Sequence, residues 1–244
     1  MGDLDVTEDA LLGGRVRLKQ PAQGYRVAID PVLLAAALPD GFRGRIADIG
    51  CGVGAAALCA AMRLPDAQVV GIERDPALAE LARQNVAQNG LTARAEIVTG
   101  DIRAAASSTA FDAVIANPPY LEPERANVQN DPRKAAATIE DDASLDIWID
   151  AALGRLRPKG MLAFVHRADR LDDLLAALHG QTGEVVVFPL WPKAGVPAKR
   201  VIVRARKGMR SPLVLNAGLV LHEAEGRYTE AAQAVLRDGA ALIR

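Results

Sequence analysis

Short apolar runs alternate with longer segments of helical periodicity along most of the chain. Runs of this length, bounded by glycine, proline or aspartate, are typical of buried strands. The runs that predict strands of one sheet are RIADIG (45–50), VVGIE (69–73), AEIVTG (95–100), FDAVIA (111–116), GMLAFVH (160–166), EVVVFPL (184–190) and RVIVRAR (200–206). Because helical segments separate most of these runs, we expect a mostly parallel sheet with helices on both faces.

Asp-Pro pairs mark the starts of two helices. Asp30-Pro31 is interpreted as the N-cap and first residue of a helix over 32–38, and Asp75-Pro76 begins another helix, which Gly90 ends. Small residues in AAALCAAM (55–62) predict a further helix. Apolar residues at helical spacing predict two more, at Leu145, Trp148, Ile149, Ala152 and Leu156, and at Leu171, Leu174, Leu175 and Leu178. Trp148 is therefore expected to lie in the core.

The expected fold class is α/β, a doubly wound, mostly parallel, seven-stranded Rossmann-like sheet. Alternation in GRVRLKQ predicts an additional strand over 14–20, ahead of the sheet. We divide the chain into an N-terminal flap or hairpin with its helix (1–40), the main domain (41–208) and a C-terminal extension packed on the same domain (209–244). The extension contains the apolar stretch LVLNAGLVLH and a predicted helix near residues 228–237.

Composition is that of a folded protein. The 244 residues include 29 Lys+Arg and 30 Asp+Glu, a net charge of −1, and 50% are hydrophobic, which excludes wholesale disorder. No apolar run approaches the roughly 18 residues of a membrane span, and MGDLDVTEDA is acidic where a signal peptide is basic. Cys51 and Cys59, like His166, His179 and His222, lack metal-ligand spacing. We expect a reduced, cytoplasmic protein with no membrane segment and no metal.

A glycine-rich segment, DIGCGVG (48–54), joins the first strand of the predicted sheet to a helix. Glycines at such a turn let the backbone approach a ligand closely, and the helix start offers N–H groups. The spacing also satisfies the dinucleotide pattern, but Asp48 would repel a pyrophosphate and can attract a cationic ligand. Glu73, at the end of the second strand, is placed to accept both hydroxyls of a ribose. The alternative is a structural turn with an exposed glutamate.

The tetrad Asn-Pro-Pro-Tyr (117–120) directly follows the fourth strand. Ligands of such sheets bind beyond the carboxyl ends of the strands. Asn117 supplies a side-chain carbonyl, the prolines lack N–H donors, and Tyr120 supplies a flat ring, so the segment suits a planar amine. A rigid turn at a strand end is the alternative, because Asn-Pro is common in loops.

Together these motifs resemble those of class I S-adenosylmethionine-dependent methyltransferases that methylate exocyclic or side-chain amide nitrogens. More closely, the chain resembles the bacterial valine-tRNA adenine-N6 methyltransferase family. The segments that carry this closer resemblance are LLGGRVRLKQPAQGYRVAIDPVLLAAAL (11–38), PLWPKAGVPAKRVIVRARKG (189–208) and LVLHEAEGRYT (219–229). The resemblance implies an enzyme that methylates the N6 amine of an adenine in the anticodon loop of tRNA, with S-adenosylmethionine as cofactor.

The resemblance also implies roles for the matching residues. The cofactor-binding residues would be Asp48, Gly50, Gly52 and Glu73 at the methionine and ribose, Asp101 and Ile102 at the adenine, and Gln20, Tyr25 and Arg26 from the flap. The target-binding, catalytic residues would be Asn117, Pro118 and Tyr120. The Asn117 side-chain oxygen and the Pro118 backbone oxygen can accept both N–H bonds of the target amine, which favours a pyramidal nitrogen as positive charge develops.

Two other functions are compatible with parts of the pattern. Glutamine methylation of a protein such as a release factor uses the same tetrad, but those enzymes carry a helical N-terminal domain, and only about 45 residues precede the first strand of this sheet. A non-catalytic cofactor-binding or RNA-binding adapter is the other possibility, against which the intact tetrad argues.

Basic residues are concentrated near the C-terminus, which bears on an RNA partner. Seven lie between residues 193 and 210, with no acid among them, although an ordinary solvated face is the alternative explanation. Alternation in RVIVRAR places Arg200, Arg204 and Arg206 on one strand face, which suits a row of phosphates. Further candidates for phosphate contacts are Arg15, Arg17, Lys19, Arg133, Lys134, Lys199, Lys207 and Arg210.

Overall fold

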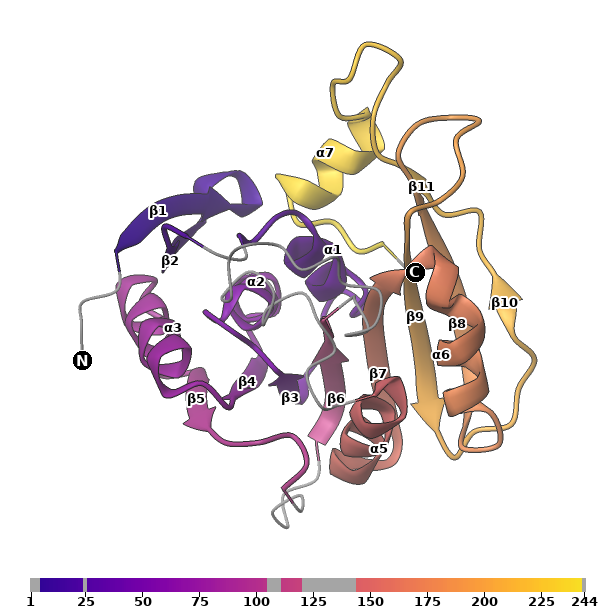
Figure 1. The fold of residues 1–244 in the computed structure, drawn as a ribbon, viewed down its shortest axis with the longest axis horizontal. Coiled ribbons are helices and arrows are strands. Elements are labelled where there is room, and N and C mark those ends of the chain that lie inside the picture. Colours follow the sequence, from indigo (N-terminus) through magenta and orange to yellow (C-terminus); the bar gives the residue numbers. More distant parts are fainter. Residues whose placement is uncertain (1–4, 24–25, 105–110, 120–143, 243–244) are drawn as a thin grey trace.

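The computed structural model describes residues 5–23, 26–104, 111–119 and 144–242 of the chain. Its centre is one twisted sheet that runs across the molecule in Figure 1. The seven long strands are β3 (Gly44–Ile49), β4 (Ala67–Glu73), β5 (Ala95–Thr99), β6 (Phe111–Ala116), β7 (Leu156–Arg167), β8 (Thr182–Trp191) and β9 (Arg200–Lys207).

The strand order is β8-β9-β7-β6-β3-β4-β5. Every adjacent pair is parallel except the two that involve β9, which runs antiparallel to both β7 and β8. Because the order reverses between β3 and β6, the chain winds outward from the middle of the sheet in both directions. The predicted doubly wound, mostly parallel α/β fold is confirmed.

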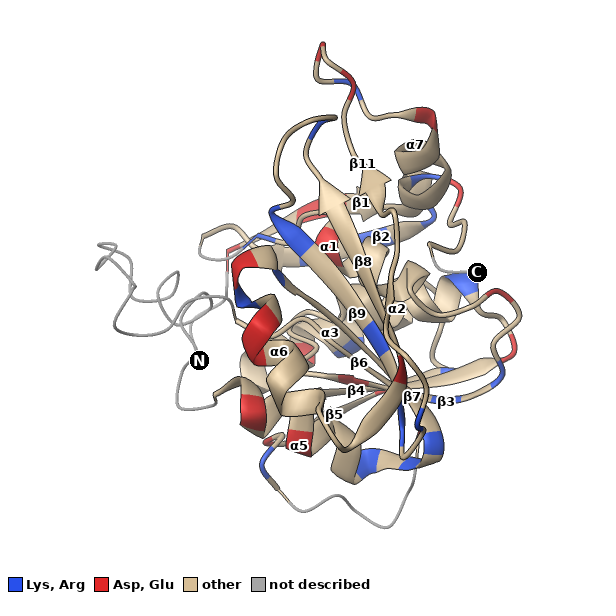
Figure 2. Cartoon of the chain, turned by 90° about the vertical axis from the view of Figure 1, so that its right-hand side faces the viewer, with Lys and Arg blue, Asp and Glu red and all other residues tan. Residues whose placement is uncertain are grey.

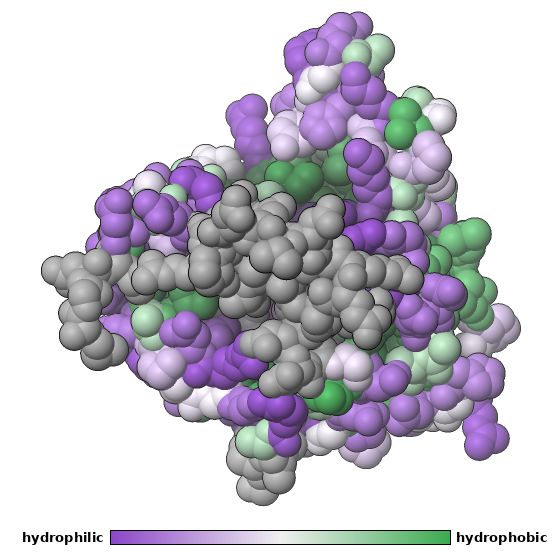
Figure 3. Space-filling view, viewed as in Figure 1, coloured by the Kyte–Doolittle hydropathy of each residue, from purple (hydrophilic) through white to green (hydrophobic). Residues whose placement is uncertain are grey.

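Within the described ranges the sheet has nine strands, whereas seven were predicted. The added strands are β10 (Val214–Leu215) and β11 (Leu219–Val220), which both pair in parallel with the outer edge of β8. They come from the apolar stretch of the C-terminal extension, where two-residue pairings are too short to leave a strand-like pattern. The two residues of β10 and the preceding Leu213 are exposed and form an apolar patch at this edge of the molecule (Figure 3).

Helices cover both faces of the sheet (Figure 1). One face packs against α1 (Asp30–Ala36), α2 (Ala55–Arg63), α3 (Pro76–Gln88) and α7 (Glu230–Leu236), and the other against α5 (Leu145–Arg155) and α6 (Leu171–Leu178). Successive strand residues face opposite sides, as the pleat requires: Ile46 and Ile115 point to the first core, Ala47 and Ala116 to the second. Trp148 lies in the second core, as predicted.

The N-terminal segment is an antiparallel hairpin of β1 (Val6–Leu11) and β2 (Val16–Pro21), joined by the short 3-10 helix η1 (Leu12–Gly14). It lies over α2 and α3 (Figure 1). The alternation of residues 14–20 predicted β2, whose Val16 and Leu18 are fully buried. The partner strand, β1, has the acidic sequence VTEDAL, which carries little strand signal.

Two element boundaries differ from the predictions. Asp30 is the first residue of α1 and not its N-cap, and its carboxylate accepts a hydrogen bond from Arg200 Nε (3.2 Å) instead of capping the helix. Leu156, predicted as the last apolar position of a helix, is the first residue of β7. Pro158 explains this change, because a proline excludes helix at the preceding residue, here Arg157.

The C-terminal extension is fastened to the α1–α2 side of the domain. Arg63, at the end of α2, donates to the carbonyls of Gly239 (2.7 Å) and Ala35 (2.6 Å) and forms an ion pair with Asp40 (2.7 Å). The Leu242 N–H also donates to the Ala36 carbonyl (2.8 Å). The boundaries at residues 40 and 208 stay predictions.

Candidate functional site

The predicted site residues follow three neighbouring strands at the same level of the sheet. In the register of the sheet, Ile49 at the end of β3 pairs with Ile72 of β4 and with Ala116 of β6. The residues that follow Ile49, Ile72 and Ala116 in the chain are Gly50, Glu73 and Asn117. The structure therefore brings the glycine loop, the acidic residue and the start of the tetrad together at the carboxyl edge of the sheet, which is the binding edge of this architecture.

The loop after β3 is built on left-handed backbone. Gly50, Gly52 and Gly54 have φ values of +68°, +55° and +86°, which glycine adopts without strain. A Cβ added to Gly52 would meet no atom within 4 Å, whereas one added to Gly50 would lie 2.3 Å from the Trp148 ring. Gly50 thus allows the loop to pack closely on Trp148, and Gly52 borders open space.

Asp48 lies beneath this loop. Its side chain is buried, and one carboxylate oxygen accepts a hydrogen bond from the Ala57 N–H (2.9 Å) in the first turn of α2. Burial raises the Asp48 pKa from 3.8 to about 7, with a further contribution from nearby Glu73, although the Ala57 hydrogen bond opposes the change. A cation bound above the loop would favour the ionised form of this carboxylate.

Glu73 connects the end of β4 to the glycine loop. Its Oε2 accepts from the Gly52 N–H (2.8 Å) and its Oε1 from the Asp75 N–H (2.9 Å). Only 8% of Glu73 is exposed, so the carboxylate is held in place. Each oxygen of an ionised carboxylate has a second lone pair, which gives Glu73 the capacity to accept two hydroxyl groups as well.

The next two predicted cofactor residues follow β5. Asp101 forms an ion pair with Arg103 (2.7 Å). Hydrogen bonds from the Arg103 side chain and from the Arg103 backbone N–H lower the Asp101 pKa to about 2. The Ile102 side chain is partly buried against the core that contains Trp148, and its carbonyl accepts from Arg155 Nη1 (2.9 Å). Asp101 is therefore an ionised acceptor at the same sheet edge as Glu73, since Thr99 pairs with Glu73.

The flap residues form their own network. Gln20 Nε2 and Arg26 Nη2 both donate to Asp9 Oδ2, at 2.6 and 2.7 Å, and Gln20 Oε1 accepts from the Val27 N–H (2.8 Å). Gln20 is buried and braces the hairpin. Tyr25 lies outside the described residues. Contacts of Gln20 and Arg26 with a cofactor stay a prediction.

The tetrad begins at the carboxyl end of β6. Asn117 is half-buried and Pro118 is buried, and the description of the tetrad ends at Pro119. Tyr120, predicted to stack on the target, lies outside the described residues, as do Arg133 and Lys134. The register nevertheless places Asn117 beside the glycine loop, because Ala116 pairs with Ile49.

Sequence reasoning missed two asparagines, Asn85 in α3 and Asn89 at the C-cap of that helix. Asn85 Oδ1 accepts from the Lys19 N–H and its Nδ2 donates to the Lys19 carbonyl, both at 2.8 Å. Asn89 makes the same pair of bonds to Arg17, at 2.9 and 2.7 Å. The sequence does contain a signal for these contacts, because two asparagines lie four residues apart near the end of a predicted helix. Asparagine has a low helix propensity, so its presence on one helix face favours a specific hydrogen-bonding role.

The arginines of the predicted phosphate-contacting row on β9 are half-buried and also bond within the fold, and their contact with phosphates stays a prediction. The alternation is as expected, but the face of β9 that contains Ile202 belongs to the core under α1. The Arg204 guanidinium donates to the Ala37 carbonyl (3.2 Å), and burial lowers its pKa. Arg206 Nε donates to the Lys159 carbonyl (2.9 Å). The basic positions visible along β9 in Figure 2 therefore contribute to the fold.

Two of the histidines, His166 and His222, lie in different surroundings. His166 is buried in β7, and burial lowers its pKa to about 4, helped by Arg170. His222 stacks on Tyr228 with ring centroids 4.7 Å apart. Among the residues that the structure describes, no three His, Cys, Asp or Glu side chains are grouped as metal ligands. No helix in the described ranges is both long and apolar enough to cross a bilayer.

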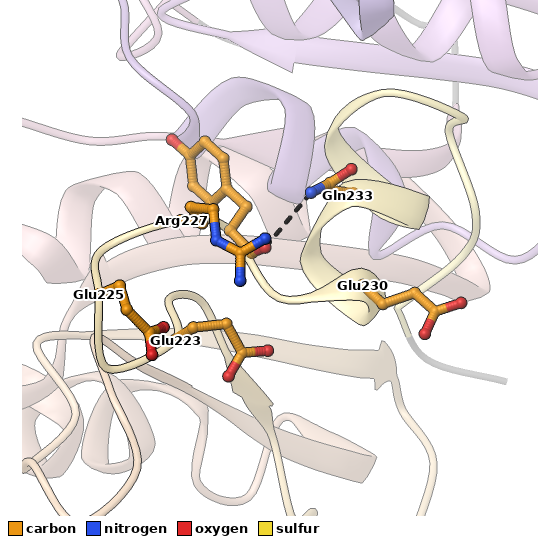
Figure 4. Close-up of a pocket in the computed structure, with 6 residues that line it drawn as sticks. Glu223, Glu225, Arg227, Glu230 and Gln233 are labelled. Carbon is orange, nitrogen blue, oxygen red and sulfur yellow. Dashed lines mark hydrogen bonds between the residues drawn. The ribbon is translucent and has the colours of Figure 1, made fainter.

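A polar hollow lies apart from the sheet edge, beside α7 (Figure 4). Its lining residues are Glu223, Glu225, Arg227, Tyr228, Glu230 and Gln233. The one interaction drawn there is the hydrogen bond from Gln233 Nε2 to the Tyr228 carbonyl (3.3 Å). None of the predicted site residues lines this hollow.

Comparison with known proteins identifies the family. The methyltransferase small domain family matches residues 26–186. A tRNA1(Val) (adenine(37)-N6)-methyltransferase from Porphyromonas gingivalis is 33% identical over 236 residues, covering 88% of each chain. A release factor glutamine methyltransferase from Moorella thermoacetica is 35% identical over 153 residues, but these cover 58% of this chain and 53% of its own.

Among solved structures, a predicted O-methyltransferase from Agrobacterium tumefaciens, protein Atu636, superposes with a TM-score of 0.74. It is 28% identical, and the match covers 88% of this chain and 99% of that chain. The chain belongs to the methyltransferase small domain family and, within it, to the tRNA1(Val) (adenine(37)-N6)-methyltransferase family of S-adenosylmethionine-dependent enzymes.

Proposed function

We propose that this enzyme methylates the N6 amine of an adenine in the anticodon loop of tRNA, in the cytoplasm. The observation that carries the proposal is the common level of Gly50, Glu73 and Asn117 at the carboxyl edge of the sheet. In this arrangement, a glycine loop that binds the cofactor would lie beside a tetrad that binds the target amine. The Porphyromonas gingivalis relative, whose name specifies adenine 37 of a valine tRNA, supports the choice of target.

The residues present fit S-adenosylmethionine. Gly52 borders open space, and Glu73 retains acceptor capacity for two ribose hydroxyls while its carboxylate is held by two backbone N–H groups. Asp48 supplies negative charge beneath the loop, and Asp101 is an ionised acceptor for an adenine amine. When bound, S-adenosylmethionine supplies an electrophilic methyl group on a positively charged sulfur.

The tetrad would hold the target. An aromatic amine is a weak nucleophile, because its lone pair is delocalised into the ring. The Asn117 side-chain oxygen and the Pro118 carbonyl can accept its two N–H bonds, which favours a pyramidal nitrogen and stabilises the positive charge that develops on it. Holding the amine in line for attack lowers the barrier further through orientation. The Tyr120 ring would stack on the base.

A loop adenine is a suitable target for such a pocket. The base must leave its stack to reach the carboxyl edge of the sheet, and single-stranded loops make this step inexpensive. The exposed basic side chain of Arg17 in the hairpin is one candidate for contacting the phosphates.

The decisive experiment uses purified protein, S-adenosylmethionine and unmodified valine tRNA, followed by mass spectrometry of the nucleosides. We expect N6-methyladenosine, and we expect a tRNA with the loop adenine replaced by guanine to accept no methyl group. Glutamine methylation of a release factor is the second candidate, because the Moorella thermoacetica relative is similar over 153 residues. Methylation of a release factor but not of tRNA would replace the proposed target while retaining the cofactor site.

A further inference from the structure

We propose that Asn85 is a positioning residue for the cofactor loop, because it joins that loop to the N-terminal hairpin through a single amide. The proposal rests on the function proposed above, since it takes the glycine loop to bind S-adenosylmethionine. It concerns a residue that neither the glycine motif nor the tetrad contains.

The Asn85 amide is fully buried and fully used. Its Nδ2 donates to the Val53 carbonyl (3.0 Å) of the glycine loop and to the Lys19 carbonyl (2.8 Å) of β2. Its Oδ1 accepts from the Lys19 N–H (2.8 Å) and from Gln88 Nε2 (3.0 Å). An asparagine side chain has two N–H donors and two lone pairs, so every bonding position is occupied.

The bond to Val53 is placed where the loop needs support. Val53 lies between Gly52 and Gly54, which both have positive φ and little steric restriction. Glu73 holds the Gly52 N–H, and Asn85 holds the carbonyl of the very next residue. The two side chains, one from β4 and one from α3, thus hold the peptide groups on either side of the Gly52–Val53 peptide.

The bonds to Lys19 couple this loop to the hairpin. Lys19 precedes Gln20, whose side chain holds Asp9 and the Val27 N–H. A shift of the hairpin away from α3 would break the Asn85 bonds to Lys19 and leave the buried amide that holds Val53 with unpaired groups. Through Asn85, the hairpin and the glycine loop keep one relative position.

Asn89, the C-cap residue of the same helix, provides a matched control. It makes the same two bonds to β2, at Arg17, because four residues of helix rise about 6 Å and two residues of strand span about 6.6 Å. Its other bond is to the Asn85 carbonyl (2.7 Å), within α3. The two asparagines thus share the hairpin contact, and the bond to the glycine loop distinguishes Asn85.

The test compares Asn85→Ala, Asn85→Asp and Asn89→Ala in the full chain. Dissociation constants for S-adenosylmethionine and S-adenosylhomocysteine are measured by calorimetry, the thermal midpoint is measured without ligand, and KM and kcat are measured with valine tRNA. We expect both Asn85 variants to raise both dissociation constants and the KM for S-adenosylmethionine at least tenfold, with kcat within about twofold. Asn89→Ala should lower the thermal midpoint but change the dissociation constants less than twofold.

Equal losses of cofactor affinity in Asn85→Ala and Asn89→Ala would overturn the proposal, as would unchanged affinity in a folded Asn85 variant. If Asn85→Ala does not fold, Asn85→Asp decides, because it preserves the size of the side chain and removes the donor to Val53. Wild-type protein that binds S-adenosylhomocysteine without methylating tRNA overturns the proposed target alone, and the comparison of the asparagines still applies. Wild-type protein that binds neither compound overturns both proposals.

Discussion

Gly52 donates its backbone N–H to Glu73 Oε2 at 2.8 Å, so the loop after β3 and the end of β4 form one hydrogen-bonded unit. This unit depends on Gly52, which has no side chain, and on the Glu73 carboxylate, which is buried and therefore held in place. Its geometry explains why a glutamate 21 residues downstream belongs to the glycine motif. Its contribution to cofactor binding can be measured directly.

Replacing Glu73 by Ala should weaken S-adenosylmethionine binding by about 1.5–3 kcal/mol, the usual range for hydrogen bonds to a charged group. The loss combines the missing acceptors and the released Gly52 N–H. Calorimetry measures it, with Glu96→Ala as control, because Glu96 is an exposed residue of β5. Undiminished affinity in Glu73→Ala would exclude Glu73 from the cofactor site.

Asn117→Ala should reduce methyl transfer on the order of a hundredfold or more, as expected when one polar group is lost at a developing charge. Cofactor affinity should remain, because Glu73, Asp48 and the glycine loop are untouched. Single-turnover methylation and calorimetry on the same preparation separate the two effects. Near-normal turnover in this variant would refute the role given to Asn117.

The Asp48 pKa of about 7 predicts a pH-dependent stability. Because the folded-state pKa lies above the unfolded value of 3.8, the carboxyl group favours folding at low pH, and this contribution is lost as the pH rises through about 7. Relative to Asp48→Asn, the wild type without ligand should lose up to about 4 kcal/mol between about pH 4 and 8, at 1.36 kcal/mol per pKa unit. Urea titrations across this range measure the difference, and parallel curves for both proteins would contradict it.

Arg63→Ala should destabilise the fold by about 3 kcal/mol, because it leaves buried carbonyls of α1 and the C-terminal extension without their donor. The Arg63 side chain is 2% exposed. Arg43→Ala is the control, because its ion pair with Asp66 is exposed and should contribute less than about 1 kcal/mol. Chemical denaturation of both variants gives the comparison, and equal losses would show that the Arg63 contacts contribute no more than a surface pair.

Binding of tRNA should weaken with salt, and the structure changes which arginines should matter. Arg204→Gln should lower the thermal midpoint and leave the salt dependence unchanged, since Arg204 bonds to Ala37 inside the fold. Arg17→Gln should reduce the slope of log K against log salt by about 1 if Arg17 contacts a phosphate. Filter binding between about 50 and 200 mM salt distinguishes them. A reduced slope for Arg204→Gln would return β9 to the RNA-binding surface.

The hydrophobic pattern predicted the long strands, the helices and the sheet edge where the site lies, because those features follow from local periodicity and strand direction. It could not predict which face of β9 is covered. Alternation placed Arg200, Arg204 and Arg206 together correctly, but the position of α1 over that face depends on packing between distant segments. Asn85 was missed for a related reason, since its partners Lys19 and Val53 lie far away in the sequence.

The position of β9 also constrains how the chain can fold as it is synthesised. β9 is the last long strand in the sequence, yet it lies between β7 and β8 and pairs with both. Until residue 207 has left the ribosome, β7 presents an unpaired edge and β8 has no place in the sheet. At about 5–20 residues per second, that interval lasts a few seconds after β7 is complete. The nascent chain is therefore most vulnerable to intermolecular strand pairing in that interval, and slower translation of residues 168–207 should increase aggregation.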